Sequence, residues 1–241
     1  MRIISTVPSQ TELVAYLGLE DDLVGITKFC VFPDSIFRYK TRIGGTKTLD
    51  LDLIRSLSPD LILSNKEENI KEQIEELRRD FNVFVSDVKE LPSATEMIKE
   101  VSRLTHRQSE GDMLIRAIKK SFIGLKPSSK SLSCLYLIWK EPWMSVGKDT
   151  FIHDMISRCG WTNICEDSIR YPEVKFDELQ PDIILLSSEP FPFKEQHKEE
   201  LQSSFPDAKI LLVDGTYFSW YGNRMKDAPG YFQGIIDAIQ L

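Results

Sequence analysis

The apolar residues of this chain form short continuous runs that alternate with stretches of helical spacing. The runs LIL at 61–63 and IILL at 183–186 are typical of strands that are buried on both faces of a sheet. Between such runs, apolar positions recur every three to four residues, which predicts helices. Strands that alternate with helices form parallel sheets with right-handed crossovers, so the pattern predicts an α/β fold.

One phrase of the sequence occurs twice. Residues 59–77 read PDLILSNKEENIKEQIEEL, and residues 181–201 read PDIILLSSEPFPFKEQHKEEL. Each copy has Pro-Asp, an apolar run, a small polar turn and a helical pattern containing KEQ. A second strand pattern follows each copy, at 81–87 and at 208–215. We therefore expect two Rossmann-like lobes with central parallel sheets, over residues 1–92 and 123–241.

Residues 93–122 have helical spacing throughout. Ser93 and Glu96 form a capping-box pattern at the start of this stretch, and apolar residues then recur at intervals of three and four. A helix of this length measures roughly 45 Å. The pattern predicts one long α-helix that bridges the lobes. Two helices broken near Gly111 are the alternative, since glycine weakens a helix.

Composition and charge narrow the function. The chain has 241 residues, of which 41% are hydrophobic, and a net charge of −7. A net acidic chain argues against nucleic-acid binding, which needs a basic face. No apolar run reaches the length of about 18 residues that a membrane span needs. The start, MRIISTVPSQTE, lacks a signal-peptide pattern, which predicts a cytoplasmic protein for the sequence as given, or a periplasmic one whose leader was trimmed.

Aromatic residues gather in the segments that follow the predicted strands. In open α/β sheets, ligands bind beyond the carboxyl ends of the strands, and two such lobes would form a cleft there. Rings in these loops are suited to covering a flat ligand, although each ring could instead pack onto its own lobe. Trp161, which follows a helix-ending glycine, is expected in the core. The predicted ligand-facing residues in these segments are Phe29, Phe32, Trp139, Trp143, Phe191, Trp220 and Tyr221.

Catalytic and metal-binding patterns are weak. The three histidines lie far apart, and no zinc, phosphate-loop or nucleophile-elbow motif occurs. Lys66 and Arg224 lie near the predicted ligand edge, where Arg224 is suited to clamping a carboxylate. Cys30 is the one cysteine on such a loop, and a buried small hydrophobe is the favoured interpretation. We therefore predict a non-catalytic binding protein without a cofactor or a resident metal; a chelatase- or transferase-type enzyme and a ligand-free interaction module are the alternatives.

The order of these motifs resembles a known family. PSQTEL at 8–13, IGGTK at 43–47, PDLIL, GKDTFIHDM at 147–155 and PDIILL occur in the order found in class III substrate-binding proteins of ABC importers. These helical-backbone receptors bind cobalamin, haem or ferric siderophores. The resemblance covers nearly the whole chain. It implies binding of a metal chelate between the lobes, and partnership of a monomer with an ABC permease.

The resemblance also implies roles for particular residues. It adds Tyr171, in a Tyr-Pro segment, to the residues that line the second-lobe side of the site. In exported relatives, an acidic residue on each lobe docks onto permease arginines. The helices that follow the two repeat strands are the matching places, and they carry the docking candidates Glu68, Glu72, Glu195 and Glu199.

Overall fold

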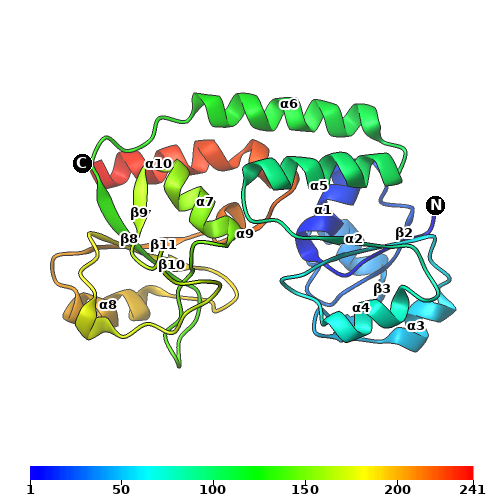
Figure 1. Cartoon of the computed structure of the whole chain (residues 1–241), viewed down its shortest axis with the longest axis horizontal. Coiled ribbons are helices and arrows are strands. Elements are labelled where there is room, and N and C mark those ends of the chain that lie inside the picture. Colours follow the sequence, from blue (N-terminus) through cyan, green and yellow to red (C-terminus); the bar gives the residue numbers. More distant parts are fainter. Residues whose placement is uncertain (241) are drawn as a thin grey trace. The chain divides into compact units, whose positions relative to one another are not determined.

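The computed structural model describes residues 1–240 and divides into two compact units (Figure 1). The first unit holds Met1–Val88, Pro92–Arg116 and Tyr221–Asn223. The second holds Lys89–Leu91, Ala117–Trp220 and the residues from Arg224 onward. Each unit has a parallel sheet with helices on both faces, so the predicted α/β fold is confirmed.

The first unit is built on a five-stranded sheet in the order β3-β2-β1-β6-β7. All four strand pairs are parallel. The strands are β1 (Ile3–Ser5), β2 (Leu23–Ile26), β3 (Thr41–Arg42), β6 (Leu61–Asn65) and β7 (Val83–Ser86). A small antiparallel hairpin, β4 (Gly44–Gly45) and β5 (Thr48–Leu49), occupies the IGGTK motif. The helices are α1 (Pro8–Tyr16), α2 (Asp34–Tyr39), α3 (Leu51–Ser56), α4 (Lys71–Leu77) and α5 (Leu91–Leu104).

Alternation along the strands divides the core of the first unit between the two faces of its sheet. On one face, Ile4 of β1 and Ile62 of β6 pack with residues of α3 and α4 in a single buried cluster. Their neighbours Ile3, Leu61 and Leu63 point to the other face and are also buried. Continuous apolar runs therefore arise because both faces of the central strands are covered.

The second unit repeats the arrangement with a four-stranded parallel sheet in the order β11-β10-β8-β9. Helices α7, α9 and α10 cover one face of this sheet, and α8 covers the other (Figure 1). The strands are β8 (Leu132–Leu137), β9 (Trp161–Asn163), β10 (Ile183–Ser187) and β11 (Lys209–Val213). The helices are α6 (Gln108–Gly124, begun in the first unit), α7 (Phe151–Arg158), α8 (Glu195–Ser204), α9 (Thr216–Ser219) and α10 (Ala228–Gln240), with 3₁₀ turns at Phe176–Glu178 and Asn223–Lys226.

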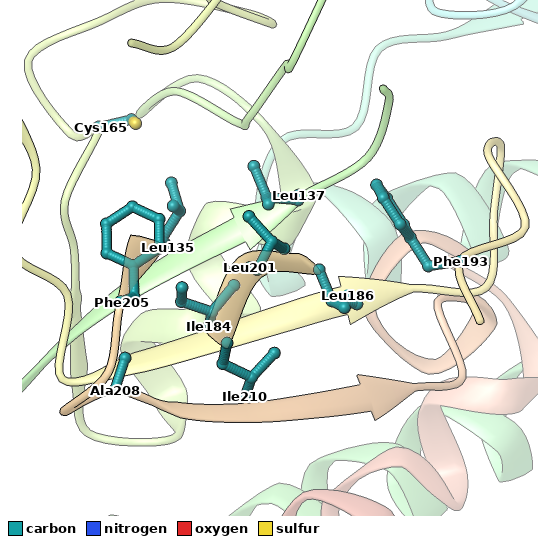
Figure 2. Packing of buried hydrophobic residues seen from close by; sticks show 10 residues of the cluster. All are labelled: Leu135, Leu137, Cys165, Ile184, Leu186, Phe193, Leu201, Phe205, Ala208 and Ile210. Atoms are coloured by element: carbon teal, nitrogen blue, oxygen red, sulfur yellow. The ribbon is translucent and has the colours of Figure 1, made fainter. Parts of the chain in front are cut away.

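One buried cluster fixes α8 on its face of the sheet. Figure 2 shows Leu135 of β8, Ile184 of β10 and Ile210 of β11 pointing toward Leu201 of α8 and Phe205, which follows it. Phe193, in the segment before α8, closes one end of the cluster. At about 25 cal/mol per Å² of buried apolar area, such clusters supply most of the stability of a unit.

The repeated Pro-Asp pair makes the same contact in each unit. The Asp60 carboxylate accepts a hydrogen bond from the Arg2 backbone N–H at 2.7 Å, and the Asp60 N–H donates to the Arg2 carbonyl at 2.8 Å. Asp182 makes the matching pair with Ser133, at 2.7 and 3.0 Å. Each aspartate precedes the central repeat strand and ties it to the neighbouring strand, β1 or β8. The repeated Pro-Asp pair thus fixes the register of the equivalent strand pair in each unit, β1 with β6 and β8 with β10.

Replacing Asp182 is expected to weaken the second unit in a pH-dependent way. Hydrogen bonds from the Ser133 backbone N–H and hydroxyl lower the pKa of the Asp182 carboxyl. A carboxyl with a lowered folded-state pKa stabilises the fold above its unfolded pKa, and this stability is lost as the pH falls through the folded value. We expect Asp182→Ala to lower the free energy of unfolding by about 1 kcal/mol at neutral pH, since the site is exposed.

Urea denaturation at about pH 7 and about pH 3 measures this effect, because the two pH values bracket the ordinary aspartate pKa. The difference between the wild type and Asp182→Ala should shrink at the lower pH. Asp167→Ala removes an exposed aspartate in a turn and serves as the control, with little expected change. An Asp182→Ala deficit of equal size at both pH values would contradict the hydrogen-bond assignment.

The single bridging helix predicted over 93–122 is wrong. The stretch forms two helices, α5 (Leu91–Leu104) and α6 (Gln108–Gly124). α5 ends in a Schellman motif, in which the Arg107 N–H donates to the Ser102 carbonyl at 2.7 Å and the His106 N–H donates to the Arg103 carbonyl at 3.3 Å. His106 takes the left-handed position with φ of 58°, where glycine is usual. The boundary between the two units falls inside α6, between Arg116 and Ala117.

Gly111 does not break a helix, because its role lies in packing. A Cβ atom at Gly111 would lie 2.0 Å from the Ser102 Oγ and 2.6 Å from the Ser102 Cβ. Ser102 is buried on α5, and its hydroxyl donates to the Ile98 carbonyl at 2.7 Å. The absence of a side chain at Gly111 therefore lets α6 approach α5 closely at this point.

Candidate functional site

Two exposed aromatic rings mark the loop that follows β2 in the first unit. Phe29 is 49% exposed and Phe32 is 44% exposed, although both are large apolar side chains. The Lys28 Nζ lies 5.2 Å from the centre of the Phe29 ring. Partly exposed rings at the carboxyl end of a parallel sheet are suited to contact with an apolar, flat ligand.

Other predicted residues of the first unit are already engaged. Lys66 forms an ion pair with Asp87. Tyr221 is buried, and its hydroxyl accepts a hydrogen bond from the Asn65 Nδ2 at 2.6 Å. Burial raises the pKa of the Tyr221 hydroxyl. The structure thus gives Tyr221 a packing role, and a direct ligand contact by this ring stays a prediction.

A buried polar network beneath these loops was not predicted from the sequence. The Thr6 hydroxyl contacts the Asn69 Oδ1 at 2.8 Å, and the Gln10 Nε2 donates to the Ser86 Oγ at 2.8 Å. Asn69 also accepts from the Asn65 backbone N–H at 3.0 Å. A sequence signal existed, because β1, β6 and β7 each end in a polar residue, Ser5, Asn65 and Ser86. The network holds the strand-to-loop junctions in place, since buried polar groups need partners.

In the second unit, Trp139 and Tyr171 are the predicted residues with exposed rings. Trp139 follows β8 and is 40% exposed, and Tyr171 is also exposed. The Trp139 ring meets the Phe191 ring edge-on, with centroids 5.8 Å apart. Phe191 belongs to the EPFPF insertion of the second repeat, so one role of this insertion is to support Trp139.

Trp143 differs from the expectation of a loop ring that faces a ligand. Its ring stacks on Phe193 at 5.9 Å with an interplanar angle of 4°, and it lies 5.1 Å from Phe176. It packs as a half-buried member at the edge of the core cluster shown in Figure 2. The Lys140 Nζ lies 5.4 Å from its ring centre. A ligand contact by Trp143 remains a prediction, and the ring has a structural role beside it.

Trp220 and Arg224 lie close together in the segment that follows β11 and α9. The Arg224 guanidinium lies 4.7 Å from the centre of the Trp220 ring. The Trp220 Nε1 donates to the Glu189 Oε1 at 2.8 Å. Burial raises the pKa of the Glu189 carboxyl, and the hydrogen bonds from Ser219 and Trp220 oppose this shift. The predicted pair Trp220 and Arg224 thus lies together, beside a glutamate that the sequence pattern did not indicate.

The four predicted docking glutamates lie in unequal surroundings. Glu72 in the first turn of α4 is exposed, as are Glu195 and Glu199 on α8. Glu195 forms an ion pair with Lys198 at 3.2 Å. Glu68 is only partly exposed, and its carboxylate accepts from the Asn65 Nδ2 at 3.3 Å. The first three are the better placed to meet a partner, and docking by any of them stays a prediction.

The cysteines are buried, and the described residues contain no cluster of metal-ligating side chains. Among residues 1–240, no three His, Cys, Asp or Glu side chains are grouped closely enough to hold a metal ion. All four cysteines are buried. Cys30 contacts the hydroxyls of Thr11 and Thr27 at 3.0 and 3.2 Å, and burial raises the pKa of its thiol, which disfavours the thiolate that binds metals. Within the same residues, no helix combines the length and the apolarity needed to cross a bilayer.

Comparisons with known proteins agree with this arrangement. The profile of the family described as "Periplasmic binding protein" matches residues 3–209. A vitamin B12-binding protein of Vibrio cholerae serotype O1 is 25% identical over 194 residues, which cover 77% of this chain and 70% of that protein.

Solved structures show the same fold at lower identity. The periplasmic vitamin B12 binding protein of Vibrio cholerae has a TM-score of 0.80 at 20% identity and covers 99% of this chain and 97% of its own. The periplasmic heme-binding protein of Roseiflexus sp. RS-1, in its apo form, has a TM-score of 0.84 at 19% identity. This match also covers 99% of this chain and 97% of the other chain. Together with the family profile, these matches confirm the resemblance to class III binding proteins.

Proposed function

Since this chain belongs to the periplasmic binding protein family, whose members bind ligands rather than transform them, we propose that it binds a flat metal macrocycle, with a corrinoid as the first candidate. The observation that carries this proposal is the partial exposure of three large rings on loops after strands, Phe29, Phe32 and Trp139. Exposed aromatic faces are suited to the broad apolar face of such a ligand. The macrocycle is cargo, and the protein needs no cofactor of its own.

The choice of a corrinoid as the first candidate rests on the curated relatives, and Tyr171 marks where a haem iron could be held instead. Several curated relatives that match this chain are named for vitamin B12. Haem iron in proteins takes an axial His, Cys, Met or Tyr. His197 is buried with its Nδ1 bonded to the Lys194 N–H, and the His153 Nδ1 contacts Asn163, so Tyr171 is a more accessible axial group than either of these histidines.

A ligand panel tests the proposal. Hydroxocobalamin, haemin and ferrichrome are titrated into the protein, followed by tryptophan fluorescence and visible absorbance. We expect hydroxocobalamin to bind with a dissociation constant of about 1 μM or tighter. Phe29→Ala and Trp139→Ala should each weaken binding by about tenfold, as for interface aromatics, because each removes stacked area.

Tyr39→Ala is the matched control, because Tyr39 is 83% exposed but lies at the end of α2, just before the amino end of β3. This variant should bind as the wild type does. Equal weakening by Tyr39→Ala would contradict the assignment of the loops. Haemin binding that is abolished by Tyr171→Phe would move the assignment from a corrinoid to a porphyrin.

We further propose that the protein serves an ABC permease as its substrate-binding component on the periplasmic side of the membrane. The exposed glutamates Glu72, Glu195 and Glu199 support this role, because carboxylates on helix surfaces are suited to pairing with arginines of a partner.

A further inference from the structure

The Trp220 side chain is fixed on two sides by residues of the second unit. Its indole N–H donates to the Glu189 Oε1 at 2.8 Å, and its ring face lies 4.7 Å from the Arg224 guanidinium. Arg224 is itself held, since its Nη1 donates to the Thr216 hydroxyl at 2.9 Å, and that hydroxyl donates to the Asp214 Oδ1 at 2.7 Å. The edge and one face of the indole therefore have defined partners.

Glu189 is held as firmly as the ring that it contacts. The same Oε1 accepts a second hydrogen bond, from the Ser219 hydroxyl at 2.5 Å, and the Ser187 hydroxyl donates to the Glu189 carbonyl at 2.5 Å. A Cβ atom at Gly215 would lie 2.9 Å from the Glu189 Cγ and 2.2 Å from the Ser187 Oγ. Glycine at this position therefore leaves room for the glutamate against the start of α9.

We propose that Glu189 is a positioning residue that orients the Trp220 indole for stacking on the ligand. The role rests on the proposed function and on the prediction that Trp220 is one of the rings that contact the flat macrocycle. A ring that is already fixed loses little rotational freedom when the ligand binds, whereas a free ring must be ordered first. Ordering one such side chain weakens binding by about two- to tenfold. Asp214, directly after β11, and Arg224, in the 3₁₀ turn Asn223–Lys226, are charged groups that act on Glu189.

The first arm of the test examines Trp220 without any ligand. The near-ultraviolet circular dichroism of each protein is compared with that of its Trp220→Phe partner, so that the difference reports the fixed indole. The wild type and Glu189→Gln, which keeps an acceptor oxygen, should give a clear difference signal. Glu189→Ala should lose most of it. Ser219→Ala is the matched control, because it removes the other donor to the same oxygen and should keep the signal.

The second arm measures hydroxocobalamin affinity. Glu189→Ala should weaken binding about two- to tenfold, Glu189→Gln should stay near the wild type, and Glu189→Ala should have no further effect in a Trp220→Ala background. Additive losses in the double variant, or an unchanged dichroism signal in Glu189→Ala, would overturn the proposal. If Glu189→Ala does not fold, Glu189→Met fills the space without an acceptor.

The two arms separate failure of this inference from failure of the proposed function. If hydroxocobalamin, haemin and ferrichrome all fail to bind the wild type, the proposed function is overturned, and the ligand role of Glu189 with it. The dichroism arm then still decides whether Glu189 orients Trp220.

Discussion

Trp161→Ala is expected to lower the free energy of unfolding by about 3–5 kcal/mol, the range for removing a buried tryptophan. Trp161 is 3% exposed and begins β9, where it pairs with Leu132 of β8. Its predicted place in the core is confirmed. Its substitution leaves a cavity beside an edge strand, and the surrounding sheet and α7 can fill this cavity only in part. Urea denaturation monitored by far-ultraviolet circular dichroism measures the loss.

Trp161→Phe is the control for side-chain volume and should lose much less stability. Trp143→Ala should fall between these two variants, because the structure packs Trp143 at the edge of the core cluster; such half-buried sites lose about 0.5–3 kcal/mol. A Trp161→Ala variant within about 1 kcal/mol of the wild type would contradict its assignment to the core, given the range quoted above.

Gly111→Ala is expected to destabilise the α5–α6 pair, although alanine is the better helix former. The helix propensity of alanine favours the substitution by about 1 kcal/mol. The new Cβ, however, would lie 2.0 Å from the Ser102 Oγ, so the two helices must move apart. Overpacking of this kind costs about 1–3 kcal/mol, so the net loss after the propensity gain is expected to reach about 2 kcal/mol. Thermal and urea denaturation of the variant measure it.

Gly234→Ala provides a control with the opposite expected sign. Gly234 lies inside α10, and among the described residues no other side chain or strand lies within 4 Å of the position of a Cβ there. Alanine should stabilise that helix by about 0.5–1 kcal/mol. Ser102→Gly should rescue Gly111→Ala, because it removes the atoms in conflict. If Gly111→Ala stabilises the protein as Gly234→Ala does, the close approach of the helices is wrong.

The sheets could be predicted because their strands carry a strong local signal. Runs such as LIL and IILL are typical of strands buried on both faces, and the central strands β6 and β10 lie where the repeated phrase predicts them. The edge strands β3 and β9 have two and three residues and were missed, since so short a pattern has no periodicity.

The end of α5 could not be predicted, because the glycine that usually ends a helix is absent there. A Schellman motif usually has glycine at its left-handed position, and here His106 occupies that position. Gly111, a few residues later, suggested the wrong break. Helical spacing continues on both sides of the turn, so the sequence pattern alone does not distinguish one long helix from a pair.

The candidate site could be predicted in its residue types but not in its contacts. Exposed rings at Phe29 and Trp139 follow from aromatic residues placed after strands. The buried position of Tyr221 and the packing of Trp143 depend on partners distant in sequence, Asn65 and Phe193 among them. Glu189 was overlooked for the same reason, since its partner Trp220 is 31 residues away.

The first unit is not a contiguous piece of chain. Tyr221–Asn223 belong to it, although the residues before and after them belong to the second unit. A chain cut inside α6 would therefore yield a first half that lacks Tyr221, and the buried Asn65 amide would lose its 2.6 Å partner. The second half would carry Tyr221 without the residues of the first unit that bury it. Gene fragments divided at that point would thus encode two incomplete folds, and reporter or biosensor fusions belong at surface turns within one unit instead.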